Sequence, residues 1–299
     1  MISQSGNTSE PGLEPTLRIS EFRRFTRAFF SRGLVTFGLV IILLFIITAV
    51  FGPLFAPYSP VRGDLANVLQ QPSSQHLLGT DYLGRDTLSR LIYGAQQSIM
   101  VGVVAVSIAA VVGVMSGLLA GFYGSWINSI IMRIMDALMS FPMILLALLL
   151  AGLLGGGLKN VMIALGVALI PGYARLMCGQ VLSLKETDYI LAGKSMGSDN
   201  WRLMFRHILP NAMPPLIVLI TMQIGAAILA EAGLSYLGIG ITPPTPSWGS
   251  MVNDGFSYLI SNPLLSLIPG LAIMVVVFAF NMVGDGLRDA LDPRLRGTL

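Results

Sequence analysis

Few residues of this chain have side chains that could carry out acid–base, nucleophilic or metal chemistry. His76 and His207 are its only histidines, which leaves no zinc-protease motif and no convincing histidine-based triad. Cys178 is its only cysteine, so an internal disulfide and a multi-cysteine metal site are excluded. The glycine cluster 152–160 lacks the Gly-Lys-Ser/Thr ending of a phosphate-binding loop. We therefore expect no catalytic, metal-binding or cofactor-binding residues, and no ATP site of this type.

Ionisable groups beside long apolar runs are the remaining candidates, because a charge in a bilayer is costly unless it faces inward or reaches the interface. Asp136, Arg175 and Asp285 fall near predicted helix ends, where long side chains reach the interface, and this favours a structural interpretation. Glu231 falls near the outer end of a predicted helix. Two interpretations stay open for it: a carboxylate that lines a translocation path, or a partner for a donor in the outer loop.

The elements that position these residues are membrane spans. Hydrophobic residues make up 54% of the chain, charged residues 11%, and the mean hydropathy is +0.75, which is typical of a polytopic membrane protein. A span needs about 20 mostly apolar residues to cross a hydrocarbon core of about 30 Å. The uncharged runs predict six spans: Leu34–Phe55, Ser98–Phe122, Ile134–Leu154, Leu158–Cys178, Met213–Leu234 and Leu264–Gly284.

The distribution of positive charge predicts the orientation of these spans. With the amino terminus inside, 14 of the 18 Lys and Arg residues fall in cytoplasmic segments, as expected because positive loops stay inside. Both termini are then cytoplasmic, and the net charge of +3 reflects this asymmetry and not nucleic-acid binding. The first apolar run is longer than the core of a cleaved signal and ends beside two prolines, so we interpret it as a span.

The predicted organisation follows from these spans. A cytoplasmic segment and the first span are followed by a long outer loop, a core of five spans that contains a charged insert, and a cytoplasmic tail. The corresponding ranges are 1–33, 34–55, 56–97, 98–285 with the insert 183–211, and 286–299.

The second predicted span carries Gly113, Gly117 and Gly121 at intervals of four residues, which places them on one helix face. Small residues at such a spacing allow two helices to approach closely in a membrane. We expect a packing face here, with part of a moving interface as the alternative.

Charged residues also gather in two segments outside the predicted spans. Asp81, Arg85, Asp86 and Arg90 alternate in sign on the outer side, and Asp81 and Arg85 would be neighbours on a helix. We expect a structural ion-pair cluster there in preference to direct contact with a substrate. A second set is expected to fix the end of the last span, and its members are Asp285, Arg288, Asp289, Asp292 and Arg294.

The charged insert separates predicted spans four and five. Residues 186–196 have helical character, Gly197 is a natural left-handed stop, and residues 201–209 resume a helix before Pro210. The insert is therefore predicted to be a helix, a glycine turn and a second helix.

The composition of the insert suits contact with another protein. Ser198 or Asp199 can cap its second helix. Met196, Trp201 and Phe205 lie among polar groups, a mixture suited to docking into a groove. A solvated connecting loop is the alternative that spacing alone leaves open.

The insert resembles the Glu-Ala-Ala signature of ABC importer permeases, in which a later glycine and an apolar Leu-Pro follow. The aligned positions are Leu191, Ala192, Gly193 and Gly197, followed by Arg-His-Ile-Leu-Pro-Asn at 206–211. Leu191 stands where the family has Glu, and Gly193 where it has the second Ala. These departures concern the local packing of the helix, while Gly197 and the 206–211 ending are retained.

Three further stretches resemble the dipeptide, oligopeptide and nickel branch of that family, specifically its second permease subunit. They are residues 76–95, 230–251 and 280–296. With the insert and the order of spans, the similarity covers about residues 20–296. Four long motifs in the right order are specific, whereas one of them alone would be only moderately so.

The resemblance implies an all-α, six-span chain with the type I ABC importer permease fold. The insert would be the coupling element that docks into a cleft of a cytoplasmic ATPase, with its turn at Ala192–Gly197. Closure of the ATPases, which would bind ATP and Mg, would push the insert and rotate spans four and five. The residues assigned to coupling are Glu186, Ala192, Gly193, Lys194, Ser195, Met196, Gly197, Trp201, His207 and Pro210.

The outer loop is the candidate surface for an external partner. Pro243, Pro244 and Pro246 stiffen it, and Trp248 adds an aromatic side chain. In a permease of the family that the chain resembles, these properties suit contact with a solute-binding protein. Alternatively, Trp248 and Glu231 are candidates for an outer gate. A loop on the lipid headgroups with Trp248 as interfacial anchor is the alternative.

The expected function is that of a pore-forming permease subunit of an ATP-driven importer, without catalysis of its own. Its expected partners are a homologous second permease, two cytoplasmic ATPases, an extracytoplasmic solute-binding protein and membrane lipid in a bacterial inner membrane, with no nucleic acid. Small peptides are the expected substrate, and nickel, glutathione or another peptide-like solute are the alternatives. An ATP-independent channel is the alternative of a different class.

Overall fold

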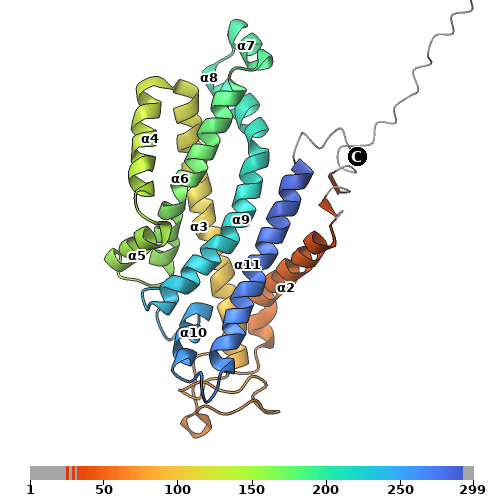
Figure 1. The fold of residues 1–299 in the computed structure, drawn as a ribbon, viewed down its shortest axis with the longest axis vertical. Helices are drawn as coiled ribbons and strands as arrows, with labels where there is room; N and C mark the ends of the chain where they lie inside the picture. Colours follow the sequence, from red (N-terminus) through yellow and green to blue (C-terminus); the bar gives the residue numbers. More distant parts are fainter. Residues whose placement is uncertain (1–24, 27–28, 31, 292–299) are drawn as a thin grey trace, which may run out of the picture.

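The computed structural model describes residues 25–26, 29–30 and 32–291, and most of that part of the chain is helical (Figure 1). Within these residues the only β-type pairing is an isolated bridge between Thr80 and Asp86. The prediction of an all-helical chain is confirmed. The elements are α2 (Gly33–Phe55), η1 (Leu65–Asn67), α3 (Thr87–Tyr123), α4 (Ser125–Met139), α5 (Met143–Leu153), α6 (Leu158–Leu184), α7 (Asp188–Ser195), α8 (Asn200–Arg202), the π-helix η2 (Leu203–Ile208), α9 (Leu209–Tyr236), α10 (Trp248–Phe256) and α11 (Leu264–Leu291).

Five helices in the described part of the chain are long and apolar enough to cross a membrane. They are α2, α3, α6, the continuous helix from α8 to α9, and α11. The pair α4 and α5 passes the same test together, which raises the number to six when the pair counts as one span. The six-span prediction agrees with this arrangement.

The third span was expected to be one helix over Ile134–Leu154, and this is wrong. The segment is bent by 88° at the break between α4 and α5. Pro142 lies at this break; it has no backbone N–H to donate, and it disfavours a helical conformation for Phe141 before it. The chain therefore turns sharply between α4 and α5, where one continuous helix was expected.

Several helices extend beyond the apolar runs that predicted them. α3 begins at Thr87 instead of Ser98, because Asp86 caps it by accepting a hydrogen bond from the Ser89 N–H. α6 continues to Leu184 and α11 to Leu291, past the predicted starts of the insert and of the tail. The length of an apolar run reflects the thickness of the hydrocarbon core, whereas capping residues determine where a helix begins and ends.

The pair α3 and α6 is held together at the predicted glycine face. A Cβ atom added at Gly117 would lie 2.3 Å from the carbonyl oxygen of Ala174 and 2.8 Å from Cβ of Met177. At Gly113 it would lie 2.5 Å from Cβ of Tyr173. Gly121 is equally close to Val181. The prediction of a packing face is confirmed, because the two backbones are in direct contact there.

A second group of helices packs beside this pair. α11 lies against both α2 and α9 (Figure 1), and Gly38 of α2 and Gly225 of α9 make the close approaches to it. Arg32, just before α2, forms an ion pair with Asp289 near the end of α11, with Nη1 and Oδ2 2.9 Å apart. Asp289 thus fixes the end of the last span as expected, while Asp292 and Arg294 lie outside the described residues.

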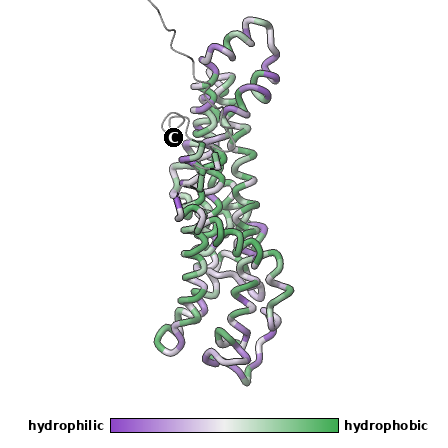
Figure 2. The backbone as a smooth tube through the Cα atoms, turned by 90° about the vertical axis from the view of Figure 1, so that its right-hand side faces the viewer, coloured by the Kyte–Doolittle hydropathy of each residue, from purple (hydrophilic) through white to green (hydrophobic). Residues whose placement is uncertain are grey.

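The two ends of the bundle differ in character. α7 and α8 project from one end, and α10 and the segment 56–86 lie at the opposite end (Figure 1). Hydrophilic residues concentrate toward the two ends and hydrophobic residues fill the length between them (Figure 2).

Asp136 of α4 and Arg175 of α6, both about half-exposed, form an ion pair with each other.

The contact at Gly117 yields a prediction for stability. Gly117→Ala should lower the free energy of unfolding by about 1–3 kcal/mol, because the added methyl group forces the α3 and α6 backbones apart. Gly179→Ala on α6 is the matched control: no atom lies within 4 Å of its Cβ position, and Ala favours a helix over Gly by up to about 1 kcal/mol. Thermal unfolding of the purified variants in detergent measures both. Equal midpoints for the two variants would contradict the packing role.

Candidate functional site

The charged insert folds as a helix, a glycine turn and a second helix. α7 ends in a Schellman turn, in which Ser198 N–H donates to the Gly193 carbonyl and Gly197 N–H to the Lys194 carbonyl. Gly197 has φ +78°, a left-handed conformation that glycine adopts without strain. Asp199 then caps α8 by accepting a hydrogen bond of 3.0 Å from the Trp201 N–H. The predicted turn and the predicted cap are both confirmed.

The outer face of the insert presents large apolar side chains away from the spans. Met196 is 81% exposed and Trp201 65% exposed, and the Trp201 ring packs on Phe205 at a centroid distance of 4.1 Å. Leu191, at the position where the resembling family has Glu, is also exposed. The insert thus leaves several large apolar side chains uncovered on its outer face.

The inner face of the insert is anchored in the bundle core. Ile190 of α7 is buried, and so are Met204 and Ile208 of the π-helix; all three belong to the cluster that contains Tyr173 and Met177 of α6. The insert is therefore packed onto α6 and α9 and is not a free loop.

The second helix was expected to end before Pro210, and this is wrong. The chain runs without a break from Asn200 to Tyr236, through the π-helix Leu203–Ile208 and past Pro210. Pro210 follows the π-helix directly, and the changed hydrogen-bond register of that segment accommodates the N–H that proline lacks. α8, η2 and α9 therefore form one continuous rod from the insert into the membrane.

The residues assigned to coupling lie together at this end of the molecule. Eight of the ten are exposed, and His207 and Gly193 are half-buried. The exposed ones are Glu186, Ala192, Lys194, Ser195, Met196, Gly197, Trp201 and Pro210.

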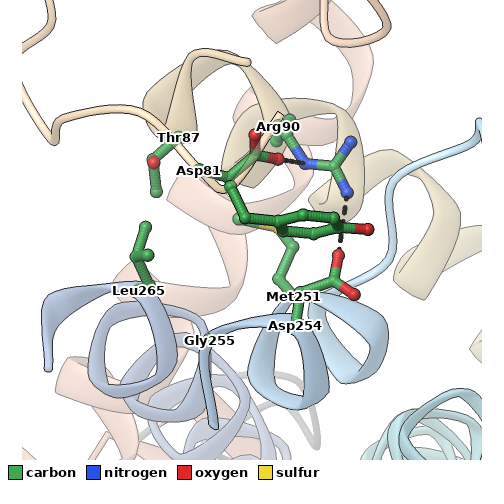
Figure 3. A pocket seen from close by; sticks show the side chains of 8 residues that line it. Asp81, Thr87, Arg90, Met251, Asp254, Gly255 and Leu265 are labelled. Atoms are coloured by element: carbon green, nitrogen blue, oxygen red, sulfur yellow. Dashed lines mark ion pairs between the residues drawn. The ribbon is translucent and has the colours of Figure 1, made fainter. Parts of the chain in front are cut away.

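The opposite end holds the predicted cluster of ion pairs, of which Figure 3 shows Asp81 and Arg90. Arg85 Nε lies 2.6 Å from Asp81 Oδ2, and Arg90 Nε lies 3.5 Å from the same oxygen. The segment is a turn and not a helix, because Asp81 Oδ1 accepts hydrogen bonds from the backbone N–H groups of Leu83 and Arg85. The expectation of a structural cluster is thus supported, with a different local conformation.

Asp254 of α10 completes the cluster and was missed by sequence reasoning. Its Oδ2 lies 3.6 Å from Arg85 Nη2 and 3.8 Å from Arg90 Nη2. Burial raises the pKa of Asp254, and Arg90 and Arg85 oppose that rise. A signal was available, since Asp254 is the only charged residue between Glu231 and Asp285.

The fourth predicted member of the cluster has a different role. Asp86 is buried, and it caps α3 through the backbone N–H and the hydroxyl of Ser89. His76 Nδ1 lies 2.9 Å from its other oxygen. Asp86 and His76 therefore hold the 56–86 segment to the first turn of α3.

Trp248 was expected to be presented by the outer loop, either to a binding protein or to the headgroups, and this is wrong. The side chain is 3% exposed, its Nε1–H donates to the Leu91 carbonyl at 2.9 Å, and its ring lies 5.5 Å from that of Phe45. The absence of a side chain at Gly94 makes room for the indole, because a Cβ there would lie 2.6 Å from Trp248 Cδ1. Trp248 therefore fastens α10 to α2 and α3.

Glu231 is fully buried among helices. Ser235 Oγ donates to Glu231 Oε1 at 2.6 Å, and the same hydroxyl accepts from the Ile241 N–H at 3.0 Å. The other carboxylate oxygen has no hydrogen-bond partner among the described residues. In this conformation Glu231 does not reach a surface, and its partner is Ser235 of the same helix, whose hydroxyl also accepts from Ile241 in the loop after α9.

Comparison with known proteins places this architecture in a family. Residues 113–297 match the family described as binding-protein-dependent transport system inner membrane component, and residues 20–72 match the N-terminal TM domain of oligopeptide transport permease C. The chain is 43% identical over 293 residues to the dipeptide transport system permease protein DppC of Alkalihalophilus pseudofirmus, which covers 97% of this chain and 96% of that protein.

Two further likenesses agree with this match. The chain is 41% identical over 295 residues to the glutathione transport system permease protein GsiD of Escherichia coli O6:K15:H31, with 98% of this chain and 97% of that protein covered. The fold matches a chain of the inward-facing MetNI methionine ABC transporter with a TM-score of 0.56 and 19% identity, over 68% of this chain and 96% of that chain. The resemblance to importer permeases is thus confirmed: the chain belongs to the family of binding-protein-dependent transport system inner membrane components.

Proposed function

We propose that this chain is the pore-forming permease subunit of an ATP-driven importer in a bacterial inner membrane. It would work with a homologous second permease, two cytoplasmic ATPases and an extracytoplasmic solute-binding protein, without catalysing a reaction itself. The observation that carries the proposal is the insert, which is exposed and apolar on its outer face and anchored in the bundle core on its inner face.

The connections of the insert suit a coupling element. α6 ends at Leu184, four residues before α7 begins, and α8 continues through the π-helix into α9. A push on the insert would therefore move both α6 and α9, the fourth and fifth predicted spans. ATP and Mg would be held by the partner ATPases, and closure of those subunits would drive a rigid-body change between inward-open and outward-open pathways.

The proposed substrates are di- and oligopeptides, with glutathione as the close alternative and nickel or another peptide-like solute as further ones. Support comes from the names of the relatives, one a dipeptide and the other a glutathione permease, at similar identity. Both substrates are short chains with amide bonds and terminal charges. In an importer of this family, the solute-binding protein would mostly determine which of these solutes is transported.

Uptake by the reconstituted transporter tests the function. Vesicles that contain the chain with its cognate permease, ATPases and binding protein should accumulate a dipeptide only when ATP is present on the ATPase side. Glutathione and nickel are compared under the same conditions. Uptake that continues after ATP is removed, by protein that never co-purifies with an ATPase, would instead identify an ATP-independent channel.

Orientation is tested by cysteine labelling in a Cys178→Ser background. Met196→Cys at the tip of the insert should react with a membrane-impermeant maleimide only from the cytoplasmic side, because positive charge gathers at that end. Ile260→Cys is the matched control, fully exposed in the segment between α10 and α11, and it should react only from outside. Labelling of Met196→Cys from outside would refute the proposed coupling role.

The glycine turn gives a test of coupling itself. Gly197→Val should reduce transport per ATP hydrolysed, because a β-branched residue at φ +78° costs about 1–3 kcal/mol and opens the turn. Gly197→Asn is the control, since asparagine tolerates this conformation and no atom lies within 4 Å of the Cβ position. ATPase activity and uptake are measured together in vesicles. If the Gly197→Val variant, the Gly197→Asn variant and the unchanged protein all transport the same amount of solute per ATP hydrolysed, the turn is not part of the coupling surface.

A further inference from the structure

The ion pair between Asp136 and Arg175 lies at the depth of the membrane and not at a helix end. α4 begins at Ser125, so Asp136 lies eleven residues further along, roughly 16 Å along the axis. Arg175 lies nine residues before the end of α6 at Leu184, roughly 14 Å along that axis. Both helices extend beyond the spans predicted from the apolar runs, which is why the sequence placed the two residues near helix ends. The hydrocarbon core is about 30 Å thick, so the pair falls inside it even if each helix projects one turn of about 5 Å into the headgroups.

The ends of α3, α4 and α6 on the side of the insert are level with one another. Asn128 Nδ2, in the first turn of α4, donates to the Ala120 carbonyl of α3 at 3.2 Å and to Cys178 Sγ of α6 at 3.3 Å. Figure 1 shows α4 alongside α6, and α4 runs away from the end that carries α7. Asp136 is eight residues, roughly 12 Å, further from that end than Asn128.

Asp136 belongs to a polar stripe along α4. Four exposed polar residues recur at intervals of three or four positions, which places them on one side of the helix. The polar stripe consists of Ser129, Arg133, Asp136 and Ser140. A neighbouring sector of α4 is apolar, and its Ile130 and Ile134 are each more than half exposed. α4 therefore presents two different surfaces to its surroundings, and only one of them suits hydrocarbon.

The charges of this surface indicate what covers it. Arg133, Asp136 and Arg175 are all exposed in this chain, and a charged side chain in hydrocarbon is costly. A packed helix of another subunit would also remove these charges from water, which is unfavourable unless each of them finds a partner. Charged groups at this depth ordinarily face a water-filled cavity. The apolar sector of α4 is therefore the side that meets lipid, and the polar stripe faces water.

We propose that the polar stripe of α4 and Arg175 of α6 line the translocation path, and that Arg175 and Asp136 bind the charged termini of the solute in transit. The inference rests on the proposed function and deepens it. A peptide with free ends carries a carboxylate and an ammonium group, and Arg175 and Asp136 carry the complementary charges. A guanidinium binds a carboxylate through two parallel N–H donors. Between transport events the two side chains pair with each other, and a bound solute replaces this one ion pair with two.

Thiol accessibility tests whether the polar stripe faces water. Single cysteines are placed at Ser140 and Ile134 in the assembled transporter with Cys178→Ser, in lipid nanodiscs that leave both membrane faces open. Ser140→Cys should react with a charged methanethiosulfonate about tenfold faster than Ile134→Cys, because the thiolate that reacts forms in contact with water. Ser140→Cys that reacts no faster than Ile134→Cys would overturn the proposal, whether lipid or the second permease covers the stripe.

Neutral variants test the role of the two charges. Arg175→Gln and Asp136→Asn should each lower dipeptide uptake per ATP hydrolysed by about tenfold, through the loss of one charge-assisted hydrogen bond to the solute. The double variant keeps a hydrogen-bonding pair between α4 and α6, yet its uptake should stay as low, because the solute termini need the charges. Arg32→Gln is the matched control: it breaks the exposed ion pair with Asp289 at the end of the bundle and should leave uptake unchanged.

The outcomes separate this inference from the proposed function. Absence of ATP-driven uptake by the unchanged transporter would overturn the proposed function. Equal uptake by the unchanged transporter and the double variant would leave that function intact and overturn the inference, because the pair would then be only a structural link between α4 and α6. The midpoints of thermal unfolding should agree closely among all these variants, since a half-exposed ion pair contributes little to stability.

Discussion

The direct backbone contact between α3 and α6 is the constraint on which the rest of the structure depends. Lipid tails are as apolar as leucine, so spans in a membrane gain little from burial alone and depend on close packing. Gly113, Gly117 and Gly121 let the two helices touch from Ile170 to Val181 of α6. α6 then supports the core cluster that holds Ile190 and Met204, and through it the insert. A shift of this pair would therefore displace the surface proposed to meet the ATPase.

Elements with a purely local cause could be predicted from the sequence. Gly197 is followed two positions later by the capping residue Asp199, and the turn depends only on these neighbouring residues. The glycine face of α3 needs only its four-residue spacing. The bend at Pro142 is also local, because a proline inside the apolar run of Ile134–Leu154 disfavours a helical conformation for the residue before it.

What could not be predicted depends on contacts between distant segments. Trp248 is buried because Gly94, more than 150 positions earlier, lacks a side chain where the indole packs. A proline-rich loop that ends in tryptophan is typical of an exposed aromatic side chain, and nothing near Trp248 in the sequence indicates that it is buried. Asp254 joins Arg85 and Arg90 for the same reason: only the fold brings α10 beside the start of α3.

The continuous rod from Asn200 to Tyr236 links the two ends of the molecule. At the end that carries α10, Ser235 bonds both Glu231 and the backbone of Ile241, and Gly249 packs on the Ala232 carbonyl, so α9 and α10 are in direct contact. Toward α3, by contrast, α10 is held by the Trp248 hydrogen bond and by ion pairs of 3.6 and 3.8 Å. Those separations exceed hydrogen-bond distance, so the pairs act through charge attraction and not through directional hydrogen bonds. A movement that begins at the insert would therefore reach α10 through α9, while the Trp248 contact and the ion pairs would resist separation of α10 from α3.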